Sequence, residues 1–369
     1  SGSGSGLGNM LRTLGIETSC DESAVAILDG DGRVEVSLLS SQIEAHAQYG
    51  GVVPELASRE HLRALPYLVE RALESVRGSI EMVAVTAGPG LIGALLVGVR
   101  FAAAFAWGRG LPLVAVDHLE GHLVSALLSL DGEPARREPE RVLALIASGG
   151  HSSWYLMDHG SRVRLGRTRD DAAGESFDKV AQVLGLGYPG GPVIDTLARR
   201  GDASAVPLPR PRLKDAPFDF SFSGLKSAAI RWIREHDVGA ATEDGEPSSV
   251  VCDLAASFEN AVVEQLMAPL AELAEIHRPH LVTASGGVAA NSLLRKRLME
   301  WGSGHEVETL LPARALTTDN AVMIAHAGQL AHAAARTDDP RRLDARAREV
   351  WQPPGMRRPC RIDEAVKES

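Results

Sequence analysis

A unit of two apolar runs joined by a turn occurs twice in the chain and constrains its fold more than any other feature. The first unit covers residues 14–18 and 24–28, and the second covers 142–146 and 152–156. Short apolar runs separated by Gly, Ser, Asp or Glu predict β-hairpins. Since helical and strand patterns alternate after each hairpin, we expect two α/β units, each a mixed or parallel sheet covered by helices.

The segments that follow the hairpins define the other expected elements. In the first half, residues 55–76 have apolar side chains at helical spacing, residues 82–86 form a strand, and the apolar run 91–107 is a buried helix. In the second half, we expect a long amphipathic helix over residues 257–276 and a helix over residues 321–334.

This organisation resembles the duplicated, two-lobed fold of the actin, sugar-kinase and heat-shock-chaperone (ASKHA) superfamily, which clamps a nucleotide with its two hairpins. We therefore expect an α/β protein with its active site in the interlobe cleft. The predicted parts are an artificial Ser-Gly leader (1–9), an N-terminal lobe (10–135), a C-terminal lobe (136–318), a helix and segment returning to the N-terminal lobe (319–351) and a surface tail (352–369).

Composition narrows the class of protein. The chain has 369 residues, of which 44% are hydrophobic, enough for two lobes. Its three cysteines include no CxxC pair, so we expect a reducing, cytoplasmic location. The run 91–107 contains Gly93, Gly98 and Arg100, which favours a core helix over a membrane span. The net charge of −10 disfavours a surface built mainly for nucleic acid, so any such contact needs a local basic patch or a partner.

Residues 118–122, His-Leu-Glu-Gly-His, are the main candidate for a metal site. Two histidines four residues apart on a helix lie on one face, where both imidazoles can bind one metal ion. The same spacing fits two hydrogen-bonded core histidines equally well. A zinc-peptidase helix has Glu directly after the first His, whereas Glu120 comes one position later and Gly121 weakens the helix.

Three glycine turns, at residues 149–150, 190–191 and 286–287, accompany this motif. A glycine turn between a strand and a helix leaves backbone N–H groups free for an anion or a sugar edge. One such turn is weak evidence, but three in one chain favour a nucleotide-binding cleft.

Five acidic residues allow more than one interpretation. Asp21 and Glu22, in the first hairpin turn, fit either turn chemistry or a loop that holds a cation or positions a nucleophile near phosphates. Asp319 fits either a helix cap or a third metal ligand. Asp178 and Asp195 fit solvated helix faces.

A series of motifs, in their order and spacing, is similar to those of one known family. They lie at residues 14–22, 49–59, 88–91, 118–122, 148–151, 171–175, 188–192, 220–226, 286–288 and 318–320. Over roughly residues 10–351 the chain resembles the TsaD family of bacterial tRNA N6-adenosine threonylcarbamoyltransferases, once described as O-sialoglycoprotein endopeptidases.

The resemblance implies transfer of an L-threonylcarbamoyl group from threonylcarbamoyl-adenylate to the N6 amine of the adenosine just 3′ of the anticodon, in tRNAs that read codons starting with A. It implies one divalent metal ion, Fe²⁺ in preference to Zn²⁺, on His118, His122 and Asp319. An ATP- or ADP-type nucleotide can occupy the same cleft. The implied adenylate-binding residues are Ile146, Ala147, Ser148, Gly149, Gly150, Asp178, Gly191, Asp195 and Asn291, and the candidate catalytic residues are Asp21, Glu22 and His151.

The implied partners are tRNA, a TsaB-like paralogue that forms a heterodimer, a TsaE-like ATPase and a TsaC-type synthase that supplies the adenylate, with no membrane involved. Three basic clusters could follow the tRNA backbone, although each equally fits a solvated face. They are Arg162, Arg164, Arg167 and Arg169; Arg210, Arg212 and Lys214; and Arg295, Lys296 and Arg297.

Three other functions fit parts of the pattern. A small-molecule O-carbamoyltransferase of the same fold usually carries an additional adenylate-forming domain, for which this chain has no room. A sugar or acid kinase of the superfamily has no role for the two histidines. A non-catalytic scaffold of the tRNA-modifying complex does not need His118, His122 and Asp319. The carbamoyltransferase and the scaffold remain the alternatives.

Overall fold

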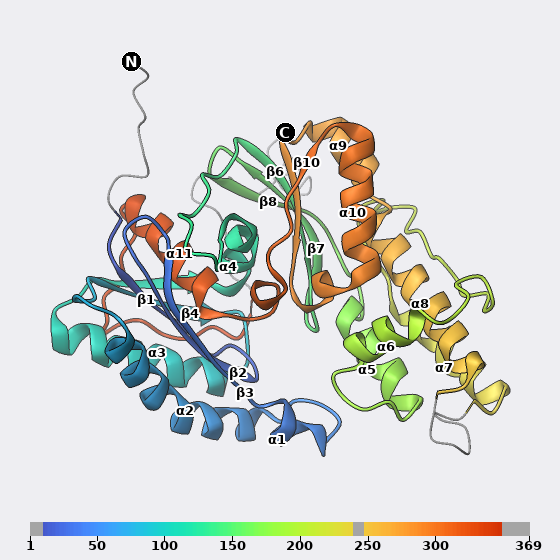
Figure 1. The fold of residues 1–369 in the computed structure, drawn as a ribbon, viewed down its shortest axis with the longest axis horizontal. Coiled ribbons are helices and arrows are strands. Elements are labelled where there is room, and N and C mark those ends of the chain that lie inside the picture. Colours follow the sequence, from blue (N-terminus) through green and yellow to red (C-terminus); the bar gives the residue numbers. More distant parts are fainter. Residues whose placement is uncertain (1–9, 239–246, 349–369) are drawn as a thin grey trace, which may run out of the picture.

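Figure 1 shows the computed structural model of the chain, which describes residues 10–238 and 247–348. The predicted leader (1–9) and the predicted surface tail (352–369) lie outside these residues. The described part contains two five-stranded sheets, one built from the first strands of the chain and one from the later strands.

The first sheet has the strand order β3-β2-β1-β4-β5. Its strands are β1 (Thr13–Glu17), β2 (Glu22–Leu28), β3 (Val34–Ser41), β4 (Met82–Gly88) and β5 (Leu113–Asp117). The strands β1 and β2 form the predicted antiparallel hairpin, and β3 pairs antiparallel with β2. On the other side, β4 runs parallel to β1, and β5 runs parallel to β4.

The second sheet has the order β10-β9-β6-β7-β8. Its strands are β6 (Arg141–Ala147), β7 (Ser152–Asp158), β8 (Ser161–Arg167), β9 (Leu281–Ser285) and β10 (Glu308–Thr309). The strands β6, β7 and β8 are antiparallel, whereas β9 and β10 continue the sheet in parallel from β6. Both sheets therefore have the same topology, which confirms the predicted duplication.

The sequence patterns do not predict the third strand of either sheet, β3 or β8. In β3, exposed and half-buried residues alternate, so no apolar run marks the strand. In β8, three of the seven residues are arginines, so the segment resembles a basic cluster more than an apolar strand. Because each strand lies at an edge, its stability comes from pairing with one neighbour and burying one face.

Helices cover both faces of the first sheet. One face packs against α2 (Pro54–Ser75) and α3 (Ile92–Arg109), while α1 (Ile43–Ala47) follows β3. The other face packs against α11 (Ala321–Ala333), which comes from the end of the described chain and contacts β1, β2 and β4. A Cβ at Gly15 would overlap the Ala321 carbonyl oxygen and lie 2.8 Å from the Ala325 Cβ, so glycine permits this close approach.

Among the described residues, α3 is the one helix long and apolar enough to cross a membrane by length and composition. It packs against α2 and β4, and 39% of its 18-residue apolar window is buried. The core helix of a folded domain meets the same criterion.

The second sheet carries its own set of helices. They are α5 (Ala173–Val183), α6 (Gly190–Ala198), α7 (Ser223–Glu235), α8 (Ser249–Met267), α9 (Leu270–His277) and α10 (Ser292–His305), with the short helix η2 (Gly287–Ala290) before α10 and η3 (Arg314–Leu316) after β10. The predicted single helix over residues 257–276 is wrong. A helix begins earlier, at Ser249, and breaks before Pro269, which lacks an N–H to continue the hydrogen bonding.

The two sheets share one apolar core. It contains Ala24 and Val116 from the first sheet, Ile146 and Leu281 from the second, and side chains of α11 and α4 (His118–Val124). The candidate metal ligands come from α4 and from the segment before α11. Both therefore lie where the two halves of the molecule meet (Figure 1).

Candidate metal centre and nucleotide site

The helix α4 positions the histidine pair. Asp117, the last residue of β5, caps this helix, since its Oδ1 accepts a hydrogen bond from the backbone N–H of Leu119 at 2.9 Å. His118 and His122 follow one helical turn apart and are buried, with 6% and 2% of their surface exposed. After Val124 the chain continues as the short helix η1 (Ser125–Leu127).

Asp319 lies against both histidines. Its Oδ1 is 3.2 Å from the Nε2 atom of His118 and 3.2 Å from the Nε2 atom of His122. The three ligand atoms lie within 4.8 Å of one another. The helix α11 is capped by Asn320 instead, whose Oδ1 accepts from the N–H of Met323 at 3.0 Å. Asp319 therefore does not cap α11, and its carboxylate faces the two histidines.

Glu17, at the end of β1, orients the first histidine. Its Oε2 lies 3.0 Å from the Nδ1 atom of His118, and the Ser19 hydroxyl lies 3.2 Å from the same nitrogen. Thr86 donates to Oε2 at 2.6 Å, and the N–H of Ser19 donates to Oε1. A hydrogen bond at Nδ1 leaves the lone pair of Nε2 available for a metal ion. Sequence reasoning placed Glu17 in a motif but gave it no role.

The electrostatics of the cluster suit a cation. Burial lowers the pKa of His118, but Asp319 and Glu17 outweigh burial and hold it well above its usual value. Burial raises the pKa of Asp319, yet the two histidines hold it well below its usual value. The buried Glu17 and the half-buried Asp319, together with the two imidazoles, form a nitrogen- and oxygen-donor set whose negative charge a divalent ion would balance. The residues present therefore fit a metal ion.

The candidate catalytic residues surround this cluster. Burial, followed by the charges of Asp319 and Asp21, raises the pKa of Glu22 to about 8, and its Oε2 is buried with no hydrogen-bond partner in the described residues. Burial, followed by the charges of His118 and His122, lowers the pKa of His151 to about 4. Side chains beside the hairpin turn of the first sheet and the glycine turn of the second are thus both close enough to interact electrostatically with the cluster.

Hydrogen bonds within the glycine turn between β6 and β7 hold its conformation. The backbone N–H of Ser148 donates to the His151 carbonyl oxygen at 2.7 Å, and the Ser148 hydroxyl accepts from the N–H groups of Gly150 and His151 at 3.3 and 3.1 Å. The preceding Ile146 and Ala147 are buried in β6. A Cβ at Gly149 or Gly150 would meet no atom within 4 Å, so space for a ligand lies beside the turn.

The other adenylate-binding candidates come from α5, from α6 and from the residue before α10. The Oδ1 atom of Asp178 accepts from the N–H of Gly190 at 2.8 Å, and burial raises the Asp178 pKa. A Cβ at Gly191 would enter open space. Asp195 in α6 is buried, so it does not lie on the solvated helix face considered from sequence, and Asn291 before α10 is buried as well.

A family model described as TsaD, tRNA N6-adenosine threonylcarbamoyltransferase, matches residues 34–326. The chain belongs to the TsaD family. A tRNA N6-adenosine threonylcarbamoyltransferase of Pelobacter propionicus is 47% identical over 322 residues, which cover 86% of this chain and 91% of that protein. A tRNA N6-adenosine threonylcarbamoyltransferase of Syntrophotalea carbinolica is 44% identical over 354 residues, which cover 94% of this chain and 99% of that protein. This TsaD-family chain is an enzyme, a transferase that modifies adenosine in tRNA.

Solved structures identify the fold. Full-length HypF in its phosphate- and nucleotide-bound form superposes with a TM-score of 0.58 at 13% identity, covering 90% of this chain and 57% of that chain. HypF of T. kodakarensis superposes with a TM-score of 0.54, also at 13% identity, over 88% of this chain and 48% of that one. This TsaD-family protein therefore has the predicted ASKHA fold.

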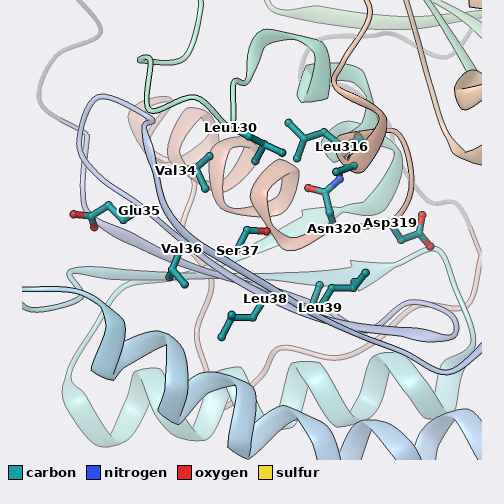
Figure 2. Close-up of a pocket in the computed structure, with 12 residues that line it drawn as sticks. Val34, Glu35, Val36, Ser37, Leu38, Leu39, Leu130, Leu316, Asp319 and Asn320 are labelled. Atoms are coloured by element: carbon teal, nitrogen blue, oxygen red, sulfur yellow. Dashed lines mark hydrogen bonds between the residues drawn. The ribbon is translucent and has the colours of Figure 1, made fainter.

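A groove of about 470 Å³ leads along the first sheet toward the metal candidates (Figure 2). Residues 34–39 of β3, including Ser37 and Leu39, line one wall, and Leu130 and Leu316 lie opposite. Asp319 lies at one end of the groove, whereas the two histidines are not among the residues that line it. The Asp319 side of the His118, His122 and Asp319 group is thus open to a cavity.

Much of the predicted basic surface is neutralised by acids. Arg162 is buried and forms a two-pronged ion pair with Glu138, with distances of 2.7 and 2.5 Å, so it does not fit a tRNA contact. The other ion pairs join Arg169 to Asp219, Arg210 to Glu264, and Arg297 to Glu264. Lys296 lies 3.8 Å from Glu300 and keeps 70% of its side chain exposed.

Proposed function

We propose that this tRNA N6-adenosine threonylcarbamoyltransferase takes its group from threonylcarbamoyl-adenylate and modifies the adenosine just 3′ of the anticodon in tRNAs that read codons starting with A. The observation that carries the proposed site is the convergence of Asp319 Oδ1 with the Nε2 atoms of His118 and His122 at 3.2 Å. We assign these residues as ligands of one divalent ion. Two histidines and one carboxylate with open positions favour Fe²⁺, and Zn²⁺ is the second choice.

The reaction requires that the N6 amine attack the carbamoyl carbonyl carbon, that the bond from this carbon to the phosphate oxygen break, and that AMP leave. A bound ion supplies Lewis-acid polarisation and charge neutralisation at this centre. Because an adenine amine is a weak nucleophile, alignment of the two substrates should supply much of the rate acceleration.

The protein groups have distinct roles in this proposal. The turn at Ser148, Gly149 and Gly150, which follows Ile146 and Ala147, holds the acyl-phosphate end of the substrate. The ribose and adenine lie against Asp178, Gly191, Asp195 and Asn291, and an ATP- or ADP-type nucleotide occupies the same place in the absence of the adenylate.

Proton transfer falls to the residues around the cluster. With its pKa at about 8, Glu22 is the strongest candidate to hold the proton that the amine releases, while Asp21 aligns the amine beside it. With its pKa at about 4, His151 is neutral at physiological pH and acts as a hydrogen-bonding group near the carbonyl.

Partners complete the proposed system. The net charge of −10 and the ion-paired arginines support weak tRNA binding by this chain alone. We therefore propose a TsaB-like heterodimer partner, a TsaE-like ATPase and a TsaC-type synthase, all in the cytoplasm.

We also propose lobe boundaries at residues 10–135 and 136–318, with residues 319–351 returning to the N-terminal lobe. The side-by-side position of α11 and β1 supports this return.

Nucleoside mass spectrometry tests the proposal. The purified protein with its partners, threonylcarbamoyl-adenylate and unmodified tRNA should form the modified nucleoside. His118→Ala and His122→Ala should abolish product, and Asp319→Ala should lose most of the roughly one bound ion per chain. His159→Ala, which changes an exposed histidine, is the matched control and should behave as wild type. Unchanged product and metal content in the first two variants would refute the metal assignment.

A further inference from the structure

Glu259 is a buried acid in α8 to which sequence reasoning gave no role. Only 5% of its surface is exposed. Its Oε1 accepts a hydrogen bond from the Nδ2 atom of Asn291 at 2.5 Å. The carboxyl group of Asp195 lies within hydrogen-bonding reach of the same side chain. Glu259 therefore contacts both of the nucleotide-binding candidates that come from α6 and from the start of α10.

Glu259, Asp195 and Asn291 belong to one network of hydrogen bonds. One oxygen of Asp195 accepts from Arg199 at 3.0 Å, and the other accepts from the hydroxyl and the N–H of Ser292. The Oδ1 atom of Asn291 accepts from the N–H of Leu294 at 2.9 Å and so caps α10. Three helices are thus joined at the side chains proposed to hold the adenylate.

Two facing carboxyl groups in a buried site cannot both be ionised without a large repulsion, so they share a proton. Burial raises the pKa of Glu259, the hydrogen bond from Asn291 opposes this, and Asp195 raises the pKa further, to about 7. The charge of Asp195 is balanced by Arg199, which leaves the proton on Glu259. A protonated Glu259 can donate to Asp195 and still accept from Asn291.

We propose that Glu259 is a positioning residue of the nucleotide site, whose protonated carboxyl group bridges Asp195 and Asn291 and holds both in the orientation that binds the adenosine part of the substrate. This inference rests on the proposed function, because that proposal assigns Asp195 and Asn291 to the adenylate. Glu259 itself does not touch the substrate.

Loss of the proton puts two carboxylates face to face and breaks the bridge. The groups that face Glu259 are Asp195 and Arg199 from α6 and Asn291 from the start of α10. Its neighbour in α8, Asn260, is tied instead to Glu264 and is not part of the bridge. Nucleotide affinity should therefore fall as the pH rises through about 7, by about tenfold between pH 6 and pH 8.

The decisive measurement is the dissociation constant for ADP at about pH 6 and about pH 8 by titration calorimetry of the purified enzyme. Glu259→Gln keeps the shape, a donor for Asp195 and an acceptor for Asn291, but cannot ionise. It should match wild type at the lower pH and bind ADP about tenfold more tightly than wild type at the higher pH. The ratio between the two proteins cancels the titration of the ADP phosphate. Glu259→Ala should bind weakly at both values.

Controls separate positioning from stability. The ADP affinity of Asn260→Ala should show the wild-type pH dependence. In turnover assays, Glu259→Ala should raise the KM for threonylcarbamoyl-adenylate more than it lowers kcat. An affinity ratio of wild type to Glu259→Gln that does not change with pH would overturn the inference. If wild type binds neither ADP nor the adenylate, the nucleotide site of the proposed function fails, and this inference fails with it.

Discussion

Replacing Glu17 by Gln should weaken metal binding by about ten- to a hundredfold, or about 1.4–2.7 kcal/mol. The buried carboxylate of Glu17 accepts from His118 Nδ1 at 3.0 Å and from Thr86 at 2.6 Å. The amide has nearly the same shape but no charge, so it loses the charge-assisted hydrogen bond that orients the imidazole and makes it more basic. The stability of the fold should change less than the metal affinity, because the amide oxygen can still accept a hydrogen bond from one of the two donors, Thr86 or the N–H of Ser19, which donate to different oxygens of Glu17.

Competition between the protein and a fluorescent chelator for Zn²⁺ measures this effect, and circular dichroism checks that the variant folds. Ser19→Ala, which removes a neutral hydroxyl 3.2 Å from the same nitrogen, should lose less than Glu17→Gln. Glu35→Gln, which breaks an ion pair with Arg12 at 2.8 Å on β3, should leave the Zn²⁺ affinity unchanged. A Glu17→Gln protein that holds Zn²⁺ as tightly as wild type would refute the role of Glu17 in orienting His118.

Three further predictions concern α11, which follows Asp319. Burial lowers the pKa of His326 to about 4, below its value in the unfolded chain, so the protein should lose about 3 kcal/mol of stability as the pH falls from about 6.5 toward 4. Urea unfolding of the wild type and of His326→Gln at several pH values tests this. The same pH dependence in both proteins would contradict it. Asn320→Ala removes the cap of α11 and should cost about 1 kcal/mol in the same assay; an unchanged midpoint would show that the cap adds nothing. Gly15→Ala should cost about 1–3 kcal/mol and reduce bound metal because its Cβ meets the backbone of α11, whereas Gly108→Ala, which meets no atom within 4 Å, should not destabilise.

The order of the main elements could be predicted from the sequence because strands and helices with a buried face leave a periodic apolar pattern. The hairpins β1–β2 and β6–β7 and the helix α2 are near their predicted positions. The edge strands β3 and β8 could not be predicted, because their stability comes from pairing with β2 and β7 and not from their own apolar content. A proline in the sequence does not by itself fix where a helix ends, because the chain breaks at Pro269 but continues as helix α2 through Pro66.

The amino-acid sequence alone was enough to identify the histidine pair, the glycine turns and the family, because these are patterns of residue type at short spacing or of motif order along the chain. Only the tertiary structure decided that Asp319 faces His118 and His122 while Asn320 caps the helix, because two adjacent polar residues before a helix fit either role until the chain folds back. The fold also brings Glu17 to His118 and Glu259 to Asn291. Each of these acids acts through a partner distant in sequence, and such contacts arise from packing and leave no local pattern.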